Sequence, residues 1–259
     1  MTLPIRAKKS LGQHFLTDKN IARNITGSLV NPNKLPVIEI GPGTGALTGF
    51  LIESQCELTL VEIDTEAAGV LRETFGTSCP PIVNGDFLKA ETMRLLPLPA
   101  CIIGNFPYNI SSQIFFRILE NRDQIPEVVC MIQREVAQRI AAPPGSKTYG
   151  ILSVLLQAWY HIEYLFTVHE NVFNPPPKVK SAVIRLTRNQ TTGLNCNEIL
   201  FFKVVKGAFN QRRKTLRNAL KSSGFNISCV DSETLDKRAE QLSVEQFIEL
   251  TRRISEAAV

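Results

Sequence analysis

The chain has 259 residues, 44% of them apolar, and a net charge of +5, which allows a complete α/β domain with its own core beside a smaller second domain. No signal-peptide pattern and no membrane-length apolar stretch occurs, so we expect a cytoplasmic protein without membrane contact. The six cysteines are widely spaced and lack a nearby histidine, so we expect reduced thiols and no metal site.

Short apolar runs alternate with helical patterns in the order typical of a doubly wound parallel sheet. Periodicity predicts strands at residues 37–40, 58–62, 82–84, 100–104 and 128–132, and helices at 44–53, 65–75 and 111–120. Two more strands, 160–168 and 181–186, are separated by a loop, so the last pair should be antiparallel. Residues 189–197 form a predicted polar linker, and residues 198–258 have only helical periodicity. We therefore predict an α/β domain at 1–190 with a seven-stranded, mostly parallel sheet, and a small all-helical domain at 191–259.

A glycine-rich turn follows the first predicted strand. Gly41 and Gly43 let a ligand approach bare backbone at the N-terminus of the next helix. Glu62 ends the second strand, 21 residues after Gly41, where an acid can accept hydrogen bonds from ribose hydroxyls. Enzymes that bind NAD or FAD share this arrangement, so the turn and the acid alone leave the nucleotide open.

Two further motifs close the third and fourth strands, and both suit flat rings that carry an amine. Asp86 can accept from an adenine amino group, while Phe87 offers the ring an apolar face. The tetrapeptide Asn-Phe-Pro-Tyr, from Asn105 to Tyr108, places an amide, a stiff proline and an aromatic ring where open α/β sheets bind ligands. Turn-forming preferences explain each motif taken singly. They do not explain why four motifs, the glycine turn, Glu62, Asp86 and the Asn-Phe-Pro-Tyr tetrapeptide, occur at the ends of four successive strands.

Basic residues concentrate in two stretches near opposite ends of the chain. Residues 6–23 carry five Lys or Arg against one acid. Residues 203–221 carry seven and no acid, among them Arg212, Arg213, Lys214 and Arg217. One short basic run usually marks a solvated helix face, but two of them beside an adenine-type corner indicate a polyanion whose phosphates both contact.

The chain resembles the class I S-adenosylmethionine-dependent methyltransferases, and among them the KsgA family of small-subunit ribosomal RNA adenine dimethyltransferases. In the first segment that carries the resemblance, residues 10–16, His14 stands where the family more usually has Asn. In the second, residues 105–111, Phe106 replaces Leu. The third segment, residues 172–181, is similar to the family's substrate loop. The fourth, residues 209–220, is similar to its helical-domain signature. The four segments that carry the resemblance are residues 10–16, 105–111, 172–181 and 209–220.

The resemblance implies S-adenosyl-L-methionine as the cofactor, without a metal, and a fold of the class I methyltransferase type. Glu39 matches an acid common in the methyltransferase glycine motif and receives a supporting role. The implied cofactor contacts are His14, Leu16, Gly41, Glu62, Asp86 and Asn105.

Adenine N6 is a poor nucleophile because its lone pair is delocalised into the ring, so positioning should dominate catalysis. We predict that the Asn105 side-chain oxygen and the Phe106 backbone carbonyl accept hydrogen bonds from N6, with Pro107 fixing the turn. Tyr108 would stack on one face of the adenine and Phe173 on the other.

The implied substrate is a pair of adjacent adenines near the 3′ end of small-subunit rRNA, within an immature subunit, modified by a monomer. Arg212, Arg213, Lys214 and Arg217 would bind the RNA. Two alternatives stay open: a large-subunit rRNA adenine methyltransferase of the macrolide-resistance type, and a non-catalytic ribosome-assembly factor with the same fold. An NAD-dependent oxidoreductase would leave the Asn-Phe-Pro-Tyr corner unexplained, and DNA adenine methyltransferases typically have an acid at the position of Asn105.

Overall fold

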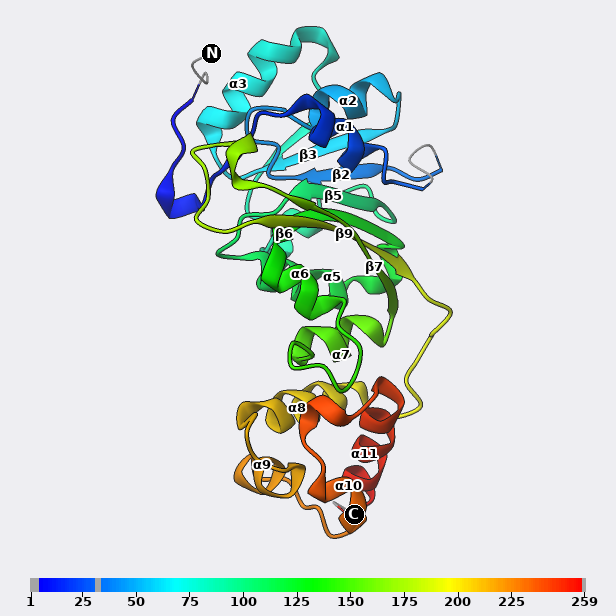
Figure 1. Cartoon of the computed structure of the whole chain (residues 1–259). Helices are drawn as coiled ribbons and strands as arrows, with labels where there is room; N and C mark the ends of the chain where they lie inside the picture. The colour runs from blue at the N-terminus through cyan, green and yellow to red at the C-terminus, as the bar shows by residue number, and fades with distance from the viewer. Residues whose placement is uncertain (1–4, 31–33, 258–259) are drawn as a thin grey trace. The chain divides into compact units, whose positions relative to one another are not determined.

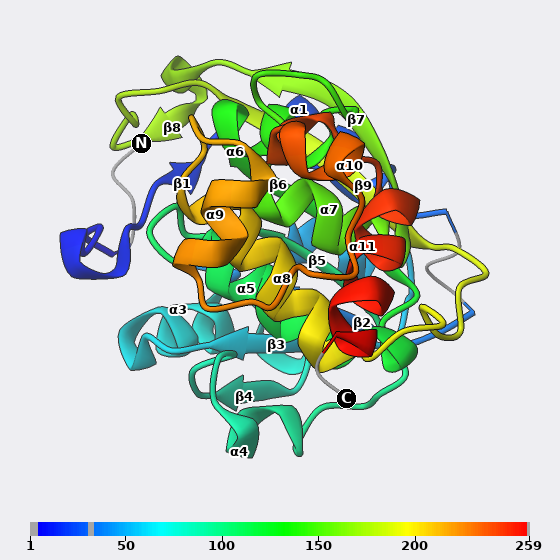
Figure 2. The same ribbon diagram turned by 90° about the horizontal axis from the view of Figure 1, so that it is seen from below.

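A seven-stranded sheet forms the centre of the first of two compact units in the computed structural model, which describes residues 5–30 and 34–257. The strands lie side by side in the order β4-β3-β2-β5-β6-β9-β7, and Figure 1 labels all of them except β4, which is labelled in Figure 2. From β4 to β6 neighbouring strands are parallel, while β9 is antiparallel to β6. The predicted α/β class and the mostly parallel sheet are therefore confirmed. The strands are β2 (Val37–Ile40), β3 (Leu58–Glu62), β4 (Ile82–Asn84), β5 (Cys101–Asn105), β6 (Glu127–Gln133), β7 (Tyr160–Val168) and β9 (Ser181–Arg188).

Helices connect the parallel strands, as crossovers in such sheets require. Polar capping and an apolar face explain two of them: Asp64 caps α3 by accepting from the Glu66 amide at 3.1 Å, and α5 buries Ile114, Phe115 and Ile118. The helices are α1 (Lys19–Thr26), α2 (Thr48–Glu53), α3 (Thr65–Phe75), α4 (Ala90–Met93), α5 (Ser111–Glu120) and α6 (Arg134–Ile140). Short 3-10 turns are η1 (Lys9–Leu11), η2 (Gly76–Ser78), η3 (Arg122–Gln124) and η4 (Glu170–Val172).

The glycine-rich turn is longer than predicted. Helix α2 begins at Thr48, not at residue 44, because Gly43 and Gly45 have positive φ angles of 58° and 82°, which an α-helix does not accommodate. The residues between β2 and α2 therefore form an open turn that faces the carboxyl end of the sheet.

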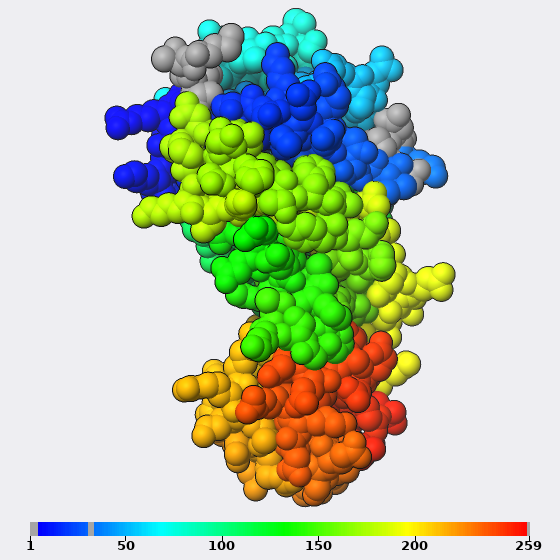
Figure 3. All heavy atoms as spheres, in the orientation of Figure 1, coloured from blue at the N-terminus to red at the C-terminus, as the bar shows by residue number. Residues whose placement is uncertain are grey.

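A two-stranded sheet was not among the predicted elements. Strand β1 (Phe15–Leu16) pairs antiparallel with β8 (Phe173–Asn174), 157 to 159 residues apart in sequence. In Figure 3 the yellow-green residues around β8 lie against the blue N-terminal residues. Strands of two residues carry no periodicity from which they could be predicted, yet this pair fixes the N-terminal segment beside the sheet.

Helices form the second unit, which comprises residues 138–161 and 189–259. The second segment of this unit begins at Asn189, within the predicted linker, and the first segment, residues 138–161, lies in the part of the chain that the prediction gives to the α/β domain. They join the helices because α7 buries its apolar residues in contact with α8, and α8 lies between α9 and α11 (Figure 2). The helices are α7 (Ile151–Gln157), α8 (Glu198–Asn210), α9 (Leu216–Ser222), α10 (Ser232–Asp236) and α11 (Val244–Glu256), with the 3-10 turn η5 (Ala239–Gln241).

Candidate functional site

The glycine-rich turn and Glu62 form one hydrogen-bonded structure. The Gly43 amide donates to Glu62 Oε2 at 3.1 Å, and the Asp64 amide donates to Glu62 Oε1 at 2.9 Å. A side chain built on Gly41, whose φ is 65°, would meet no atom within 4 Å, so the space beside that backbone is open. Each Glu62 oxygen accepts one backbone hydrogen bond and keeps a lone pair for a ligand. Burial raises the pKa of the Glu62 carboxyl, against the effect of these amides.

A second carboxyl group lies deeper in the same site. Glu39, on β2, is 1% exposed and accepts a hydrogen bond from the Thr48 hydroxyl at 2.7 Å. Burial raises the pKa of Glu39 to about 8, and the nearby charge of Glu62 adds to the effect. Glu39 therefore holds α2 to the end of β2 and adds an acid to the wall.

Asp86 and Phe87 follow β4 at the same edge of the sheet. Asp86 Oδ1 accepts from the Leu88 amide at 2.9 Å, which fixes the carboxyl group in an Asx turn. Phe87 is 4% exposed. Ile63, which directly follows Glu62, lines the same space although it is 50% exposed, and its role was not predicted. An apolar residue directly after a strand-end acid is the sequence signal that could have found it.

The Asn-Phe-Pro-Tyr corner begins at the end of β5. Asn105 Nδ2 donates to the backbone carbonyl of His14 at 2.9 Å, and no described residue donates to Asn105 Oδ1. The side chain of Phe106 is fully buried, with its ring edge against Phe115 at a centroid distance of 6.0 Å. None of the described residues donates to the Phe106 carbonyl either. Two unused acceptors thus stand next to each other in the chain.

Tyr108 and His14 connect this corner to the loop after β8. Their rings are stacked, with centroids 5.6 Å apart and planes inclined by 27°. His14 Nδ1 lies 2.8 Å from the Pro175 carbonyl oxygen and must carry the proton, because a carbonyl oxygen only accepts. The Tyr108 hydroxyl is hydrogen-bonded to Ser181, and burial raises the pKa of Tyr108. The His14 imidazole therefore contacts the corner and the loop, while its backbone carbonyl orients Asn105.

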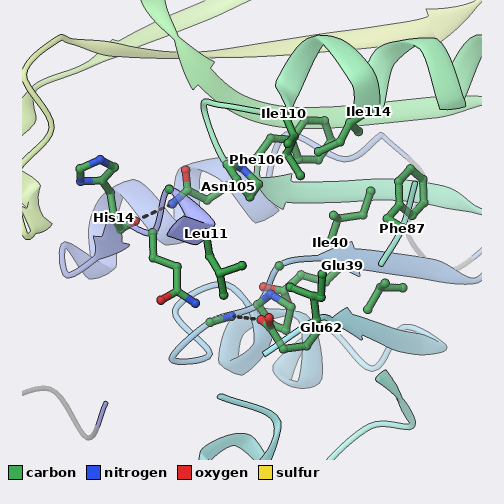
Figure 4. Close-up of a pocket in the computed structure, with 18 of the residues that line it drawn as sticks. Leu11, His14, Glu39, Ile40, Glu62, Phe87, Asn105, Phe106, Ile110 and Ile114 are labelled. Carbon is green, nitrogen blue, oxygen red and sulfur yellow. Dashed lines mark hydrogen bonds between the residues drawn. The ribbon is translucent and has the colours of Figure 1, made fainter. Parts of the chain in front are cut away.

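All these groups surround one cavity at the carboxyl ends of β2 to β5, with Glu39 and Glu62 on one side and Asn105 and Phe106 on another (Figure 4). The acids Glu39, Glu62 and Asp86 line it, and neither Lys nor Arg occurs among the described lining residues. Eleven predicted site residues line it: His14, Leu16, Gly41, Gly43, Glu62, Asp86, Phe87, Asn105, Phe106, Pro107 and Tyr108.

Phe173 is the exception. Its side chain is 4% exposed and belongs to the hydrophobic core of the first unit, together with Leu16. In this arrangement the ring does not face the cavity and is not placed to cover the second face of an adenine, because it packs in the core and β8 pairs with β1. The lining residues that were not predicted include Leu11, Ile110 and Ile114.

The four predicted RNA-binding residues differ in their surroundings. Arg212 donates to the carbonyls of Tyr149, at 2.8 Å, and Lys147. Arg217 pairs with Asp236 at 2.9 Å. The side chains of Arg213 and Lys214 are exposed, and no described acid pairs with them. Two of the four cations are thus engaged within the second unit, and two are available to a partner.

No cluster of three or more His, Cys, Asp or Glu side chains that could hold a metal occurs within residues 5–30 and 34–257. Over the same residues, every helix is too short or too polar to span a bilayer.

Comparisons with known proteins identify relatives of the chain. A family model described as "Ribosomal RNA adenine dimethylase" matches residues 5–256. A protein of Parabacteroides distasonis named "Ribosomal RNA small subunit methyltransferase A" is 57% identical over 249 residues, which cover 95% of this chain and 93% of the relative. A dimethyladenosine transferase from Plasmodium falciparum shares the fold, with a TM-score of 0.81 at 23% identity over 95% of this chain and 99% of that one. The 23S rRNA methyltransferase ErmE aligns with a TM-score of 0.70 at 28% identity, over 93% of this chain and 99% of its own. The chain belongs to the ribosomal RNA adenine dimethylase family.

Proposed function

We propose that this protein transfers methyl groups from S-adenosyl-L-methionine to N6 of two adjacent adenines near the 3′ end of small-subunit rRNA, giving N6,N6-dimethyladenosine during ribosome biogenesis. It acts as a monomer, in the cytoplasm, on an immature small subunit. The observation that carries the proposal is the orientation of Asn105, whose amide nitrogen donates to the His14 carbonyl and leaves Oδ1 as an acceptor beside the Phe106 carbonyl.

The cavity suits a cationic nucleoside. Glu62 would accept hydrogen bonds from the ribose hydroxyls, and Asp86 from the adenine amino group. Phe87 and Ile63 would flank the adenine ring, while Gly41, Gly43 and Leu16 give the ligand close contact with the glycine turn and β1. His14 would contact it through its backbone. S-adenosyl-L-methionine, when bound, supplies an electrophilic methyl group on a positively charged sulfur.

The charge of the lining argues against a dinucleotide. Glu62 and Asp86, with no Lys or Arg among the described lining residues, favour a ligand that carries sulfonium and ammonium charges. Glu39 adds little to this charge near neutral pH, because its pKa is raised to about 8. The anionic pyrophosphate of NAD or FAD would lie among like charges there. The charge of the lining therefore supports a methyltransferase over an oxidoreductase.

Catalysis rests on holding N6 in line with the methyl group. Asn105 Oδ1 and the Phe106 carbonyl would accept the two N6 hydrogens and draw the nitrogen toward tetrahedral geometry, while Pro107 fixes the turn. Tyr108 would stack on the adenine through the face that His14 leaves uncovered. Phe173 could contribute only if it left the hydrophobic core, so we assign the stacking to Tyr108.

The helical unit would supply phosphate contacts. Arg213 and Lys214 would bind the RNA backbone directly, while Arg212 and Arg217 would act mainly by holding the loop at residues 147–149 and the helix α10 in place. On this proposal residues 1–190 carry out cofactor binding and catalysis, and residues 191–259 bind RNA.

Two other functions compete with this one. The 28% identity to a 23S rRNA methyltransferase keeps large-subunit rRNA as a candidate substrate, although relatives more than half identical are named for the small subunit. A non-catalytic assembly factor would have no use for the two free acceptors at Asn105 and Phe106.

Tritium transfer from labelled S-adenosyl-L-methionine separates these functions. We expect incorporation into immature small subunits that lack the modification, none into large subunits, and recovery of dimethyladenosine from the rRNA. Asn105→Ala should lower the rate about a hundredfold, as expected for loss of one well-placed hydrogen-bond partner, with cofactor binding retained. The exposed Asn24→Ala on α1 serves as the matched control. Incorporation into large subunits only, or into neither, would overturn the proposal.

A further inference from the structure

A second hollow of about 1360 Å³ adjoins the cavity within the first unit. The two share five lining residues, Gly12, Gln13, His14, Tyr108 and Asn109. One wall of this groove is the N-terminal segment before β1, and the other is the loop after β8. The pairing of β1 with β8 fixes the two walls relative to each other.

The charge of the groove is positive and largely unneutralised. Arg6 and Lys9 on the N-terminal wall and Lys178 on the loop wall are exposed, and no described acid pairs with any of them. The one acid of the lining, Glu66, is already engaged by Lys8, with Nζ 3.1 Å from Oε2. A polyanion entering the groove would meet three available cations.

Apolar surface lies between these cations. Val179 is 45% exposed, and Pro175 and Pro176 are exposed beside it. Cations that follow a phosphate backbone, together with apolar surface for the bases, are what single-stranded nucleic acid requires of a groove. A free inorganic anion would need only the cations.

The position of the groove restricts what it can hold. An adenine that enters the cavity from the groove passes Tyr108, which lines both hollows, on its way to the acceptors of Asn105 and Phe106. The nucleotides attached to that adenine on either side must then remain outside the cavity. The groove is the space that opens there.

We propose that this groove binds the single strand that flanks the target adenine. Arg6 and Lys9 neutralise phosphates on one side of the extruded nucleotide, Lys178 neutralises one on the other side, and Val179 packs against a neighbouring base. This assignment rests on the proposed function, and it adds four RNA-binding residues of the first unit to those of the helical unit.

The salt dependence of binding tests the three cations. The probe is a fluorescently labelled, single-stranded 15-nucleotide RNA, titrated at 50 to 200 mM salt with the full-length protein. Each phosphate contact to a single strand contributes about 0.7 to the slope of log K against log salt concentration, so a triple Arg6→Gln, Lys9→Gln, Lys178→Gln variant should lose about 2 from that slope.

A matched triple variant controls for total charge. Arg72→Gln, Lys89→Gln and Arg94→Gln remove three exposed cations of the same unit that line neither hollow and lie outside the basic stretch at residues 6–23. We expect the slope to stay within about 0.5 of the wild-type value, because these side chains would make no phosphate contact. Equal loss of slope in the two triple variants would overturn the assignment and leave only a general effect of charge.

A separate pair of variants tests the apolar contact. Val179→Ser should weaken binding about two- to fivefold without changing the salt slope, since it removes apolar contact and no charge. Leu95→Ser, at a residue that is 69% exposed outside both hollows, should change nothing. Unchanged affinity of the Val179→Ser variant would show that the groove binds phosphates without contacting a base, against the proposal.

The two proposals fail in different ways. Cofactor binding should be unchanged in every variant, which also verifies folding. A wild-type protein that methylates small subunits while the groove variants keep the full salt slope refutes the groove and leaves the function intact. A wild-type protein without methyltransferase activity refutes the function, whatever the slope.

Discussion

Replacement of His14 should affect the RNA substrate and spare the cofactor. The imidazole donates from Nδ1 to the Pro175 carbonyl at 2.8 Å and stacks on the Tyr108 ring, while the bond that orients Asn105 comes from the backbone of His14 and survives any substitution. The side chain therefore positions Tyr108 and the loop rather than the methyl donor.

The structure gives the size of the effect. His14→Ala removes one hydrogen bond, which contributes about 0.5 to 1.5 kcal/mol, and one stacked ring pair of about the same size. Together the two contacts contribute about 1 to 3 kcal/mol. Because the hydrogen bond is solvent-exposed, we take the lower half of this summed range and expect a loss of about 1 to 2 kcal/mol. This corresponds to a fall of about 5- to 30-fold in kcat/KM for the RNA substrate.

Two further variants separate the contributions. His14→Asn keeps a nitrogen at the δ position, able to donate to Pro175, and loses the ring; His14→Phe keeps the ring and loses the donor. Each should recover about half of the lost free energy. Steady-state kinetics with immature small subunits give kcat/KM, and calorimetry gives the dissociation constant of S-adenosyl-L-methionine, which should change less than twofold. Tenfold weaker binding of S-adenosyl-L-methionine with an unchanged kcat/KM for the RNA substrate would refute this reasoning and indicate that the imidazole contacts the cofactor.

Three other predictions concern the cavity and its frame. Glu62→Gln turns an amide nitrogen toward a backbone donor, so the cofactor should bind about 10- to 100-fold more weakly by calorimetry; an unchanged dissociation constant would contradict the role of this acid. Because burial raises the pKa of Glu39 to about 8, the folded protein retains a proton that the unfolded chain releases above about 4.5. The free energy of unfolding without ligand should therefore fall as the pH rises from about 5 to about 8, by up to about 1.4 kcal/mol per pH unit, and denaturant titrations of Glu39→Gln should lack that slope. Gly45→Ala forces a side chain at a φ of 82° to within 2.7 Å of the Phe75 ring and should cost about 2 kcal/mol in the same assay, whereas Gly69→Ala, in open space on α3, should be neutral or stabilising.

Local pattern and topology together made the cavity predictable. Gly41, Glu62, Asp86 and Asn105 stand at the ends of four apolar runs, and parallel strands bring such ends to one edge of a sheet. The boundaries of the elements depended on backbone conformations that the hydrophobic periodicity does not reveal. The positive φ angles of Gly43 and Gly45, for example, delay the start of α2.

Contacts between residues distant in sequence could not be predicted. The residues next to Phe173 in the sequence are compatible with a ring that faces a base and with one that packs in the core. Only the pairing of β8 with β1, which sequence periodicity does not reveal, places the ring in the core. Arg212 belongs to an exposed basic run in sequence, but in the fold one of its terminal nitrogens donates to two backbone carbonyls, those of Lys147 and Tyr149. The role predicted for a charged residue from its local sequence thus changes when the fold places hydrogen-bond acceptors from a distant segment beside it.

The hydrogen bond from Asn105 to the His14 carbonyl limits which residues can stand at position 105. An aspartate there would turn a carboxylate oxygen toward a carbonyl oxygen, two acceptors with no proton between them. The acid could remain only if it stayed protonated or if the N-terminal segment withdrew, and withdrawal would remove a wall of both hollows. The end of β5 and the N-terminal segment are therefore chemically matched, and a change from amide to acid at one requires a new donor from the other.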